Sequence, residues 1–286
     1  MIPFFTLREI HLFGPLAIKP YAVFLTVGIC LGYWLVHRRT EEAAIPQKEI
    51  RNAVIWAMVF GFVGAHLAAI LLYHPELIER DGYLVLLKVW TGSSSFGGIA
   101  GGLIGLIIYF RRLNKPWLVQ AEIMLQGLVA AWIFGRLGCT FAHDHIGNQT
   151  SFFLAFQYPA GARHNLGFYE FLLALLVLFP VVLILHRRRA KPGSYLTAIS
   201  LIYAPVRFGL DFLRITGVAD ADARYRGLTP AQFGCIALFV YGLWMFTQGD
   251  FLAQRRKDAK RYRVARGFLC AFTSLREKHF RSPGLF

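Results

Sequence analysis

Seven apolar segments long enough to cross a lipid bilayer dominate this chain. A membrane-spanning segment forms a helix because its backbone polar groups have no water to bind in the hydrocarbon, and the thickness of the hydrocarbon sets its length at about 20 mostly apolar residues. The segments cover residues 16–36, 54–72, 96–110, 118–134, 168–185, 194–213 and 231–246. We therefore predict an all-α polytopic membrane protein with seven transmembrane helices. The third segment is short and rich in glycine, so we expect it to pack inside the helix bundle.

The composition excludes an ordinary soluble protein. Hydrophobic residues make up 56% of the chain and charged residues 16%, whereas a soluble domain has about 25% charged residues. The net charge of +15 would suggest nucleic-acid binding in a soluble protein. Here the basic residues lie beside the apolar segments, so membrane topology explains them better and we expect no nucleic-acid partner. The four cysteines form no CxxC motif, which indicates neither a disulfide framework nor a zinc-binding pattern.

The connecting segments alternate in charge. Segments rich in lysine and arginine follow the first, third, fifth and seventh apolar segments, and the connections between them are much less basic. Because basic loops stay on the cytoplasmic side, this alternation predicts an external N-terminus and a cytoplasmic C-terminus. We divide the chain into a seven-helix unit, residues 1–250, and a basic cytoplasmic tail, residues 251–286, that lies on anionic membrane lipids.

A short stretch after the fourth apolar segment concentrates reactive side chains. It reads GRLGCTFAHDHIG and carries Arg136, Cys139, His143, Asp144 and His145. A charge at the middle of a bilayer costs about 2.5–3.5 kcal/mol, so ionisable groups there indicate a functional site. The alternative is a loop that has left the membrane and is hydrated.

The sixth apolar segment also contains charges. Arg207, Asp211 and Arg214 follow one another at i, i+4 and i+7, which places them on one helical face. The predicted topology puts this face in the outer half of the membrane, at the level of Arg136. Guanidinium groups bind phosphate oxygens in a planar, bidentate manner. We therefore expect Arg136 and Arg207 to form a pocket for a phospholipid head group, although Arg214 alone is also explained by snorkelling to the interface.

Four motifs in this chain match one known family in order and spacing. They are Gly135-Arg136-x-Gly138 with Asp144 and Gly147, Arg163-His164 with Tyr169-Glu170, Arg207-Phe208 with Asp211 and Arg214, and Leu228-Thr229-x-x-Gln232. In these motifs the chain resembles bacterial prolipoprotein diacylglyceryl transferases, from about Tyr21 to residue 245. The resemblance implies a multi-pass enzyme of the bacterial cell inner membrane with seven helices. It also implies transfer of diacylglyceryl from phosphatidylglycerol to the lipobox cysteine thiol of a prolipoprotein signal peptide.

The motifs and the resemblance together indicate the candidate site. The candidate catalytic residues are Arg136, Arg207, His143, Asp144 and His145. The candidate substrate-binding residues are Tyr21, Arg136, Gly147, His164, Glu170, Arg207, Asp211 and Arg214. We expect the arginines to hold phosphate, one of the two histidines to act as a base, and the aspartate to orient or balance charge. We expect no cofactor, and no metal at His143, Asp144 and His145, because adjacent residues rarely converge on one ion.

This chain departs from the family pattern at several positions. The histidine that the family carries after serine-phenylalanine in the third helix is Gly97, and the signature asparagines are Cys139 and Ala142. Two alternatives therefore stay open. One is a non-catalytic phospholipid-binding or transport paralogue. The other is a transferase with a different acceptor, in which Cys139 acts as a covalent relay.

Overall fold

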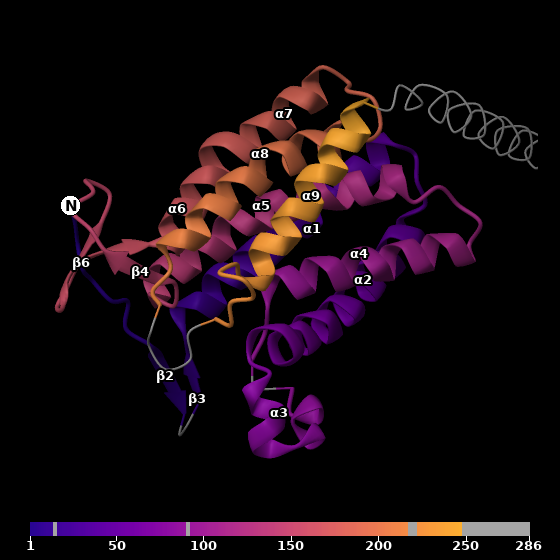
Figure 1. Cartoon of the computed structure of the whole chain (residues 1–286). Helices are drawn as coiled ribbons and strands as arrows, with labels where there is room; N and C mark the ends of the chain where they lie inside the picture. Colours follow the sequence, from indigo (N-terminus) through magenta and orange to yellow (C-terminus); the bar gives the residue numbers. More distant parts are fainter. Residues whose placement is uncertain (14–15, 90–91, 217–221, 248–286) are drawn as a thin grey trace, which may run out of the picture.

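A computed structural model describes residues 1–13, 16–89, 92–216 and 222–247 (Figure 1). The helices are α1 (Pro20–Glu42), α2 (Gln47–Ala68) with its π-helical extension η1 (Ala69–Tyr73), α3 (Glu76–Asp81), the 3-10 turn η2 (Tyr83–Leu87), α4 (Ser95–Arg112), α5 (Leu118–Ala142), α6 (Leu166–Leu173), the π-helical turn η3 (Ala174–Leu178), α7 (Phe179–Arg187), α8 (Ser194–Leu210), the 3-10 turn η4 (Asp211–Leu213) and α9 (Pro230–Thr247). The strands are β1 (Ile2–Pro3), β2 (Ile10–Phe13), β3 (Leu16–Ile18), β4 (Ile146–Gln149), β5 (Phe156–Tyr158) and β6 (Gly161–Asn165).

Six of the described helices are long and apolar enough to cross a membrane. They are Pro20–Glu42, Gln47–Tyr73, Leu118–Ala142, Leu166–Arg187, Ser194–Leu213 and Pro230–Thr247. The predicted polytopic helical architecture is therefore confirmed at this level. The third predicted segment, 96–110, forms α4, but its glycines and the two arginines at its end keep α4 out of these six. The predicted basic tail, 251–286, lies outside the described residues.

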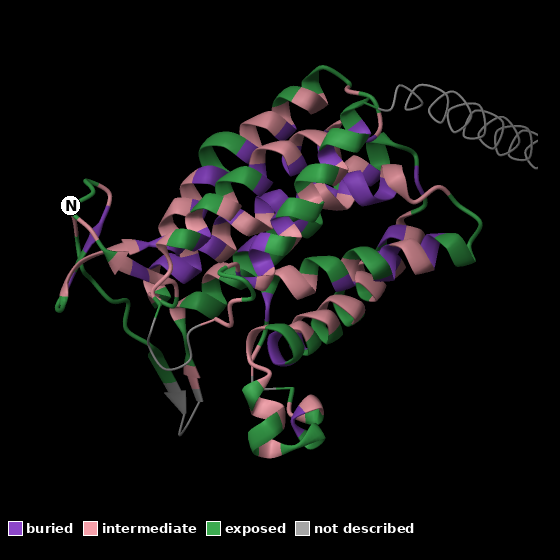
Figure 2. Cartoon of the chain, viewed as in Figure 1, coloured by how far each residue is buried: buried purple, intermediate pink, exposed green. Residues whose placement is uncertain are grey.

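The outward faces of these helices are apolar. Figure 2 shows buried residues on the inner faces and exposed residues around the outside of the bundle. Large apolar side chains are among those exposed, such as Met58 and Phe62 on α2, Leu176 on η3, and Trp244 and Phe246 on α9. Extended apolar surface of this kind is typical of an interaction with lipid or protein rather than with water.

The helices associate mainly as three pairs, in which α2 packs on α4, α1 on α5, and α8 on α9. The α2 and α4 backbones touch. A Cβ atom on Gly64 would lie 2.6 Å from the carbonyl oxygen of Gly97, and one on Gly97 would lie 2.3 Å from the Cβ of Ala68. Small residues permit this approach in membrane helices. The glycine-bearing face of α4 is thus packed on α2, whereas Ile99, Leu103 and Ile104 on its other face are exposed, so α4 is not enclosed by the bundle as predicted.

The span Leu166–Arg187 consists of three consecutive helical pieces. The π-helical turn η3 separates α6 from α7 and is followed closely by Pro180. Proline has no N–H to donate to the preceding turn, and a π-helical turn accommodates that missing hydrogen bond within a continuous helix.

A small β-structure lies at the end of the bundle where α5 ends and α6 begins. One sheet has the strand order β1-β5-β6-β4, and β2 and β3 form a separate antiparallel pair. β1 is parallel to β5, while β5 and β4 are antiparallel to β6. Only helices were predicted from the sequence, so these strands correct that prediction. They fix the loop between α5 and α6, which carries part of the site.

Candidate functional site

A cavity of about 210 Å³ lies at the sheet end of the bundle. Its lining comes from the end of α2, the start of α4, and α5, α6, α8 and α9. The polar and charged side chains that line it are Tyr73, His74, Ser93, Ser94, Ser95, Arg136, His145, Glu170, Tyr203, Arg207, Arg214 and Asp222. Charged groups from three membrane helices therefore face one enclosed space.

Glu170 holds two arginines from different helices. It is 3% exposed, at the buried face of α6. Its Oε2 lies 3.1 Å from Nε of Arg136, and its Oε1 lies 3.5 Å from Nε of Arg207. The structure thus brings together the two arginines that the sequence analysis paired. A carboxylate between two guanidiniums offsets the cost of burying them.

Further contacts fix each of these charges. The Arg136 guanidinium carbon lies 4.5 Å from the ring centroid of Trp132, one helical turn earlier, in a cation–π contact. Arg207 Nη1 donates to Asp211 Oδ1 at 2.6 Å. The Tyr203 hydroxyl donates to Glu170 Oε2 at 3.4 Å. Trp132 and Tyr203 were not among the site residues predicted from the sequence. The only available signal for them was their spacing of one helical turn from Arg136 and Arg207.

Asp211 is completely buried where α8 ends, and α9 begins beside it. The Thr229 hydroxyl donates to Asp211 Oδ2 and accepts from the backbone N–H of Gln232 at 3.2 Å. The Gln232 side chain accepts from Thr229 N at 2.9 Å and donates to the Phe208 carbonyl at 3.1 Å. This reciprocal pattern is a capping box. The leucine-threonine-x-x-glutamine motif therefore fixes the start of α9 against the acid of the site.

Arg214 links the site to the loop after α5. Its backbone forms an antiparallel bridge with Gly147. A Cβ atom on Gly147 would lie 2.5 Å from the Leu213 carbonyl oxygen and 2.8 Å from the His164 Cβ, so only glycine fits at this position without a shift. The Arg214 side chain contacts Asp222 through Nη1 and His145 through Nη2.

His145 lines the cavity as a neutral imidazole. Burial, with added repulsion from Arg136, Arg214 and Arg207, lowers the pKa of His145 to about 3. Arg214 Nη2 lies 3.2 Å from His145 Nδ1, and since arginine only donates, Nδ1 accepts and Nε2 carries the proton. A general base is most effective with a pKa near the working pH, so this environment does not support His145 as the base.

The structure does not bring His143 to the cavity. His143 adopts a left-handed conformation (φ 53°) directly after α5, and its ring packs among aromatic side chains of the sheet. Its Nδ1 lies 3.0 Å from the Tyr158 hydroxyl and its Nε2 lies 2.9 Å from the Phe5 carbonyl oxygen. Both nitrogens are thus engaged, which does not support the expectation that His143 supplies a base.

Four predicted substrate-binding residues are not among those that line the cavity: Tyr21, Gly147, His164 and Asp211. His164 Nδ1 lies 2.8 Å from the Tyr169 hydroxyl, and burial lowers the pKa of His164. Tyr21, near the start of α1, is 37% exposed and packs on Gly138 of α5. Tyr21 on α1 therefore lies against the end of α5, near Cys139 and Asp144.

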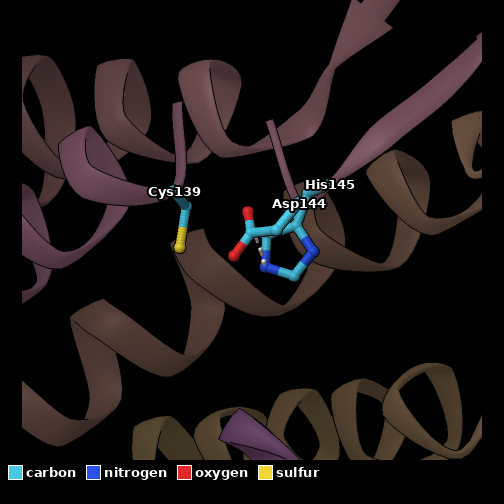
Figure 3. Close-up of side chains that lie close together, drawn as sticks. All are labelled: Cys139, Asp144 and His145. Atoms are coloured by element: carbon cyan, nitrogen blue, oxygen red, sulfur yellow. Dashed lines mark ion pairs between the residues drawn. The ribbon is translucent and has the colours of Figure 1, made fainter. Parts of the chain in front are cut away.

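Cys139, Asp144 and His145 converge next to the cavity (Figure 3). One possible ligand atom from each lies within 4.8 Å of the other two. Burial raises the pKa of Asp144. From the sequence we expected no metal at His143, Asp144 and His145. In the structure it is Cys139, and not His143, that lies beside Asp144 and His145.

Comparison with known proteins relates this site to one family. The family model for prolipoprotein diacylglyceryl transferase matches residues 9–248. The chain belongs to the prolipoprotein diacylglyceryl transferase family. A phosphatidylglycerol–prolipoprotein diacylglyceryl transferase of Nitratidesulfovibrio vulgaris is 29% identical over 249 residues, which cover 84% of this chain and 93% of that protein. One of Wolbachia pipientis is 28% identical over 244 residues (82% and 91%), and one of Thermus thermophilus is 34% identical over 152 residues (52% and 54%).

This transferase-family chain has no space for a histidine at the family position. Gly97 lies against Ala68 and the Gly64 carbonyl oxygen, where a Cβ atom would come within 2.4 Å of both. The departure seen in the sequence is thus built into the packing of α2 on α4. Among the described residues of the α5–α6 loop, His145 is the one that lines the cavity together with the arginines.

Proposed function

We propose that this chain transfers diacylglyceryl from phosphatidylglycerol to the lipobox cysteine thiol of prolipoproteins. Its family supports this function, as do the names of the relatives that align with most of its length. The observation that carries the proposal is the pairing of Arg136 and Arg207 on Glu170 at the wall of one cavity. Paired guanidiniums fit the phosphate of a phospholipid head group.

In this proposal the arginines act on the leaving group. The acceptor thiol loses its proton to solvent and its sulfur attacks the glycerol carbon of the diacylglyceryl group, while the bond from that carbon to the phosphate oxygen breaks. The released glycerol phosphate gains negative charge as it leaves. Arg136 and Arg207, held in place by Glu170 and Asp211, stabilise that charge without reorganising. Arg214 and Gly147 position the loop that carries Asp144 and His145 beside the lipid.

The proposed function is consistent with a specific membrane arrangement. We take α4 as a seventh span, with the N-terminus outside and the C-terminus in the cytoplasm of a bacterial inner membrane. The basic ends of α1, α4 and α7 then lie together on the cytoplasmic side, at Arg39, Arg111–Arg112 and Arg187. Residues 251–286 would continue there as the basic tail. The cavity then lies at the level of the external head groups, where a prolipoprotein signal peptide also presents its cysteine.

Complementation tests this proposal. A bacterial strain depleted of its own transferase is supplied with the wild-type chain, with Arg136→Ala, or with Arg188→Ala as a control. Arg188 is an exposed arginine just after α7, at the opposite end of the span Leu166–Arg187 from Glu170. We expect growth and thioether-linked lipid on a reporter lipoprotein with the wild type and the control only. Undiminished transfer by Arg136→Ala would reject the site.

The tight packing of Gly97 favours a second candidate, a phospholipid-binding paralogue without turnover. Purified protein with phosphatidylglycerol vesicles and a lipobox peptide separates the two functions. A transferase releases glycerol phosphate in proportion to the lipid-modified peptide. A binding protein retains phosphatidylglycerol and releases none.

A further inference from the structure

The convergence of Cys139, Asp144 and His145 follows from how α5 ends. Cys139 lies in the last turn of the helix, and the left-handed conformation of His143 reverses the chain directly after it. The reversal carries Asp144 and His145 back beside the Cys139 thiol. Cys139 is 7% exposed, whereas the Asp144 side chain is 45% exposed, so the cluster lies between the protein interior and an open surface.

We propose that Cys139, Asp144 and His145 bind a zinc ion that activates the acceptor thiol. A thiolate, an imidazole and a carboxylate form a mixed ligand set suited to zinc and unsuited to magnesium or calcium. Three protein ligands leave the fourth tetrahedral position open, as in catalytic zinc sites. Because His145 lines the cavity that is proposed to hold the lipid, the open coordination position lies near the proposed phosphate site.

The three ligand atoms lie within 4.8 Å of one another and have to move closer together to share one ion. Asp144 Oδ1 and His145 Nε2 are 3.8 Å apart. Two such ligands at about 2.0–2.1 Å from a tetrahedral zinc ion are roughly 3.3 Å apart. The charges also balance, because a thiolate and a carboxylate neutralise the zinc ion. The bound site is then neutral, and the acceptor thiolate adds one negative charge beside Arg136, Arg207 and Arg214.

Zinc binding would change one contact of Arg214. Coordination through Nε2 moves the imidazole proton to Nδ1, which then cannot accept from Arg214. Arg214 has carboxylates available in its place, since Nε lies 3.8 Å from Asp211 and Nη1 already contacts Asp222. The His145–Arg214 contact and the zinc ion are therefore alternatives.

A zinc ion would deprotonate the acceptor thiol although this chain has Gly97 in place of the family histidine. This role of the metal rests on the proposed function. A thiol bound to zinc is deprotonated, so no histidine base is needed. The lipobox thiol loses its proton to solvent as its sulfur binds zinc. The same sulfur then forms the bond to the glycerol carbon, while the bond from that carbon to the phosphate oxygen breaks. The electron pair of the broken bond leaves with glycerol phosphate, and the zinc ion keeps its oxidation state.

Cobalt binding tests the site independently of transfer. The full-length protein in detergent is stripped with a chelator, dialysed, and titrated with Co²⁺, which gives a sulfur-to-metal charge-transfer band when a thiolate binds it. We expect one equivalent to bind with this band. Cys139→Ser should abolish the band, and Asp144→Asn or His145→Ala should weaken binding at least about tenfold. Cys30→Ser, at an exposed cysteine of α1, should leave the titration unchanged. A band that is absent from the wild type, or that persists in Cys139→Ser, would overturn the site.

A second arm tests the role of the metal. We expect a lipobox peptide to shift the cobalt band and its serine counterpart to leave the band unchanged. Stripping should lower transfer from phosphatidylglycerol vesicles at least about tenfold, and Zn²⁺ should restore it. Transfer that survives complete stripping overturns the thiol-activating role. The protein could bind Co²⁺ with the expected band, and the peptide could shift that band, without any release of glycerol phosphate. That result would support the zinc site and reject the proposed function.

Discussion

Nε of Arg136 lies 3.1 Å from Oε2 of Glu170, and both side chains are more than nine-tenths buried. This pair joins α5 to α6, and through the other carboxylate oxygen it also reaches Arg207 on α8. One carboxylate thus ties together three helices from separate parts of the sequence. Its removal should affect stability and transfer at the same time.

Replacing Glu170 by glutamine should destabilise the protein. The change keeps the size of the side chain but leaves two buried guanidiniums without their shared counter-charge. Breaking a buried ion pair in this way costs about 3–5 kcal/mol. Thermal unfolding in detergent should show a clearly lower midpoint for Glu170→Gln. Glu79→Gln, at an exposed position on α3, serves as the control and should unfold like the wild type. Equal midpoints for all three proteins would contradict the bridging role.

Arg207→Lys should lower transfer although it keeps the positive charge. Arg207 contacts Glu170 through Nε and Asp211 through Nη1, and a single ammonium group cannot reproduce this planar fork. We expect transfer to fall about 100-fold, the scale for losing one donor to a developing anion. The measurement is the initial rate with vesicles and a lipobox peptide. Arg188→Lys provides the matched control, and similar rates in both variants would argue against a directional contact.

Gly147→Ala should disturb the bridge to Arg214. The added methyl group would lie 2.5 Å from the Leu213 carbonyl oxygen, so the backbone has to move. Overpacking of this kind costs about 1–3 kcal/mol. We expect lower thermal stability together with slower transfer. Gly209→Ala, on α8, has open space around the new methyl group and should be neutral or slightly stabilising. Wild-type behaviour of Gly147→Ala would show that the bridge tolerates displacement.

Introducing the family histidine should fail to improve this enzyme. In Gly97→His the new side chain would collide with Ala68 and Gly64, and it would separate α2 from α4. We expect a lower unfolding midpoint and no gain in transfer rate. Gly98→Ala is the comparison, because its methyl group would make only ordinary contacts of 3.5 Å or more. Faster transfer by Gly97→His would mean that the two helices separate easily.

His164 should contribute to the loss of stability in mild acid. Burial lowers the pKa of His164 in the folded protein, so the unfolded chain binds a proton more readily. The stability of the fold is therefore unaffected by His164 above about pH 6.5, the pKa of histidine in the unfolded chain. It decreases as the pH falls below that value. Comparing unfolding midpoints at neutral and mildly acidic pH, we expect His164→Gln to lose less than the wild type. Equal losses would assign the acid sensitivity to other groups.

The membrane helices were readily predicted because length and apolarity are sufficient to identify a lipid-facing helix. Their ends were less accurate. The predicted segment 118–134 stopped before Arg136, whereas α5 continues to Ala142 with Arg136 and Thr140 buried inside it. Hydropathy treats a charge as the end of a span, but here Glu170 on another helix balances the charge. The sheet was missed because its strands are short and β1 pairs with β5 from a distant part of the chain.

The candidate site was predicted in part. Arginines inside apolar segments are rare enough to indicate a shared site, and Arg136 and Arg207 do share one. The role of Glu170 was not evident, since an acid near a helix N-terminus is already explained by the helix dipole. The choice between His143 and His145 depends on the left-handed backbone at His143, which directs one ring to the sheet and the next to the cavity.

The contact of α2 with α4 has a consequence for how a lipid enters. Where the Gly64 and Gly97 backbones touch, no side-chain layer lies between these two helices that could slide or open. They should move as a single rigid body. Residues of this body and of α8 both line the cavity. A two-tailed lipid should therefore gain access by a hinge-like swing of α2 and α4 together, rather than by separation of one from the other.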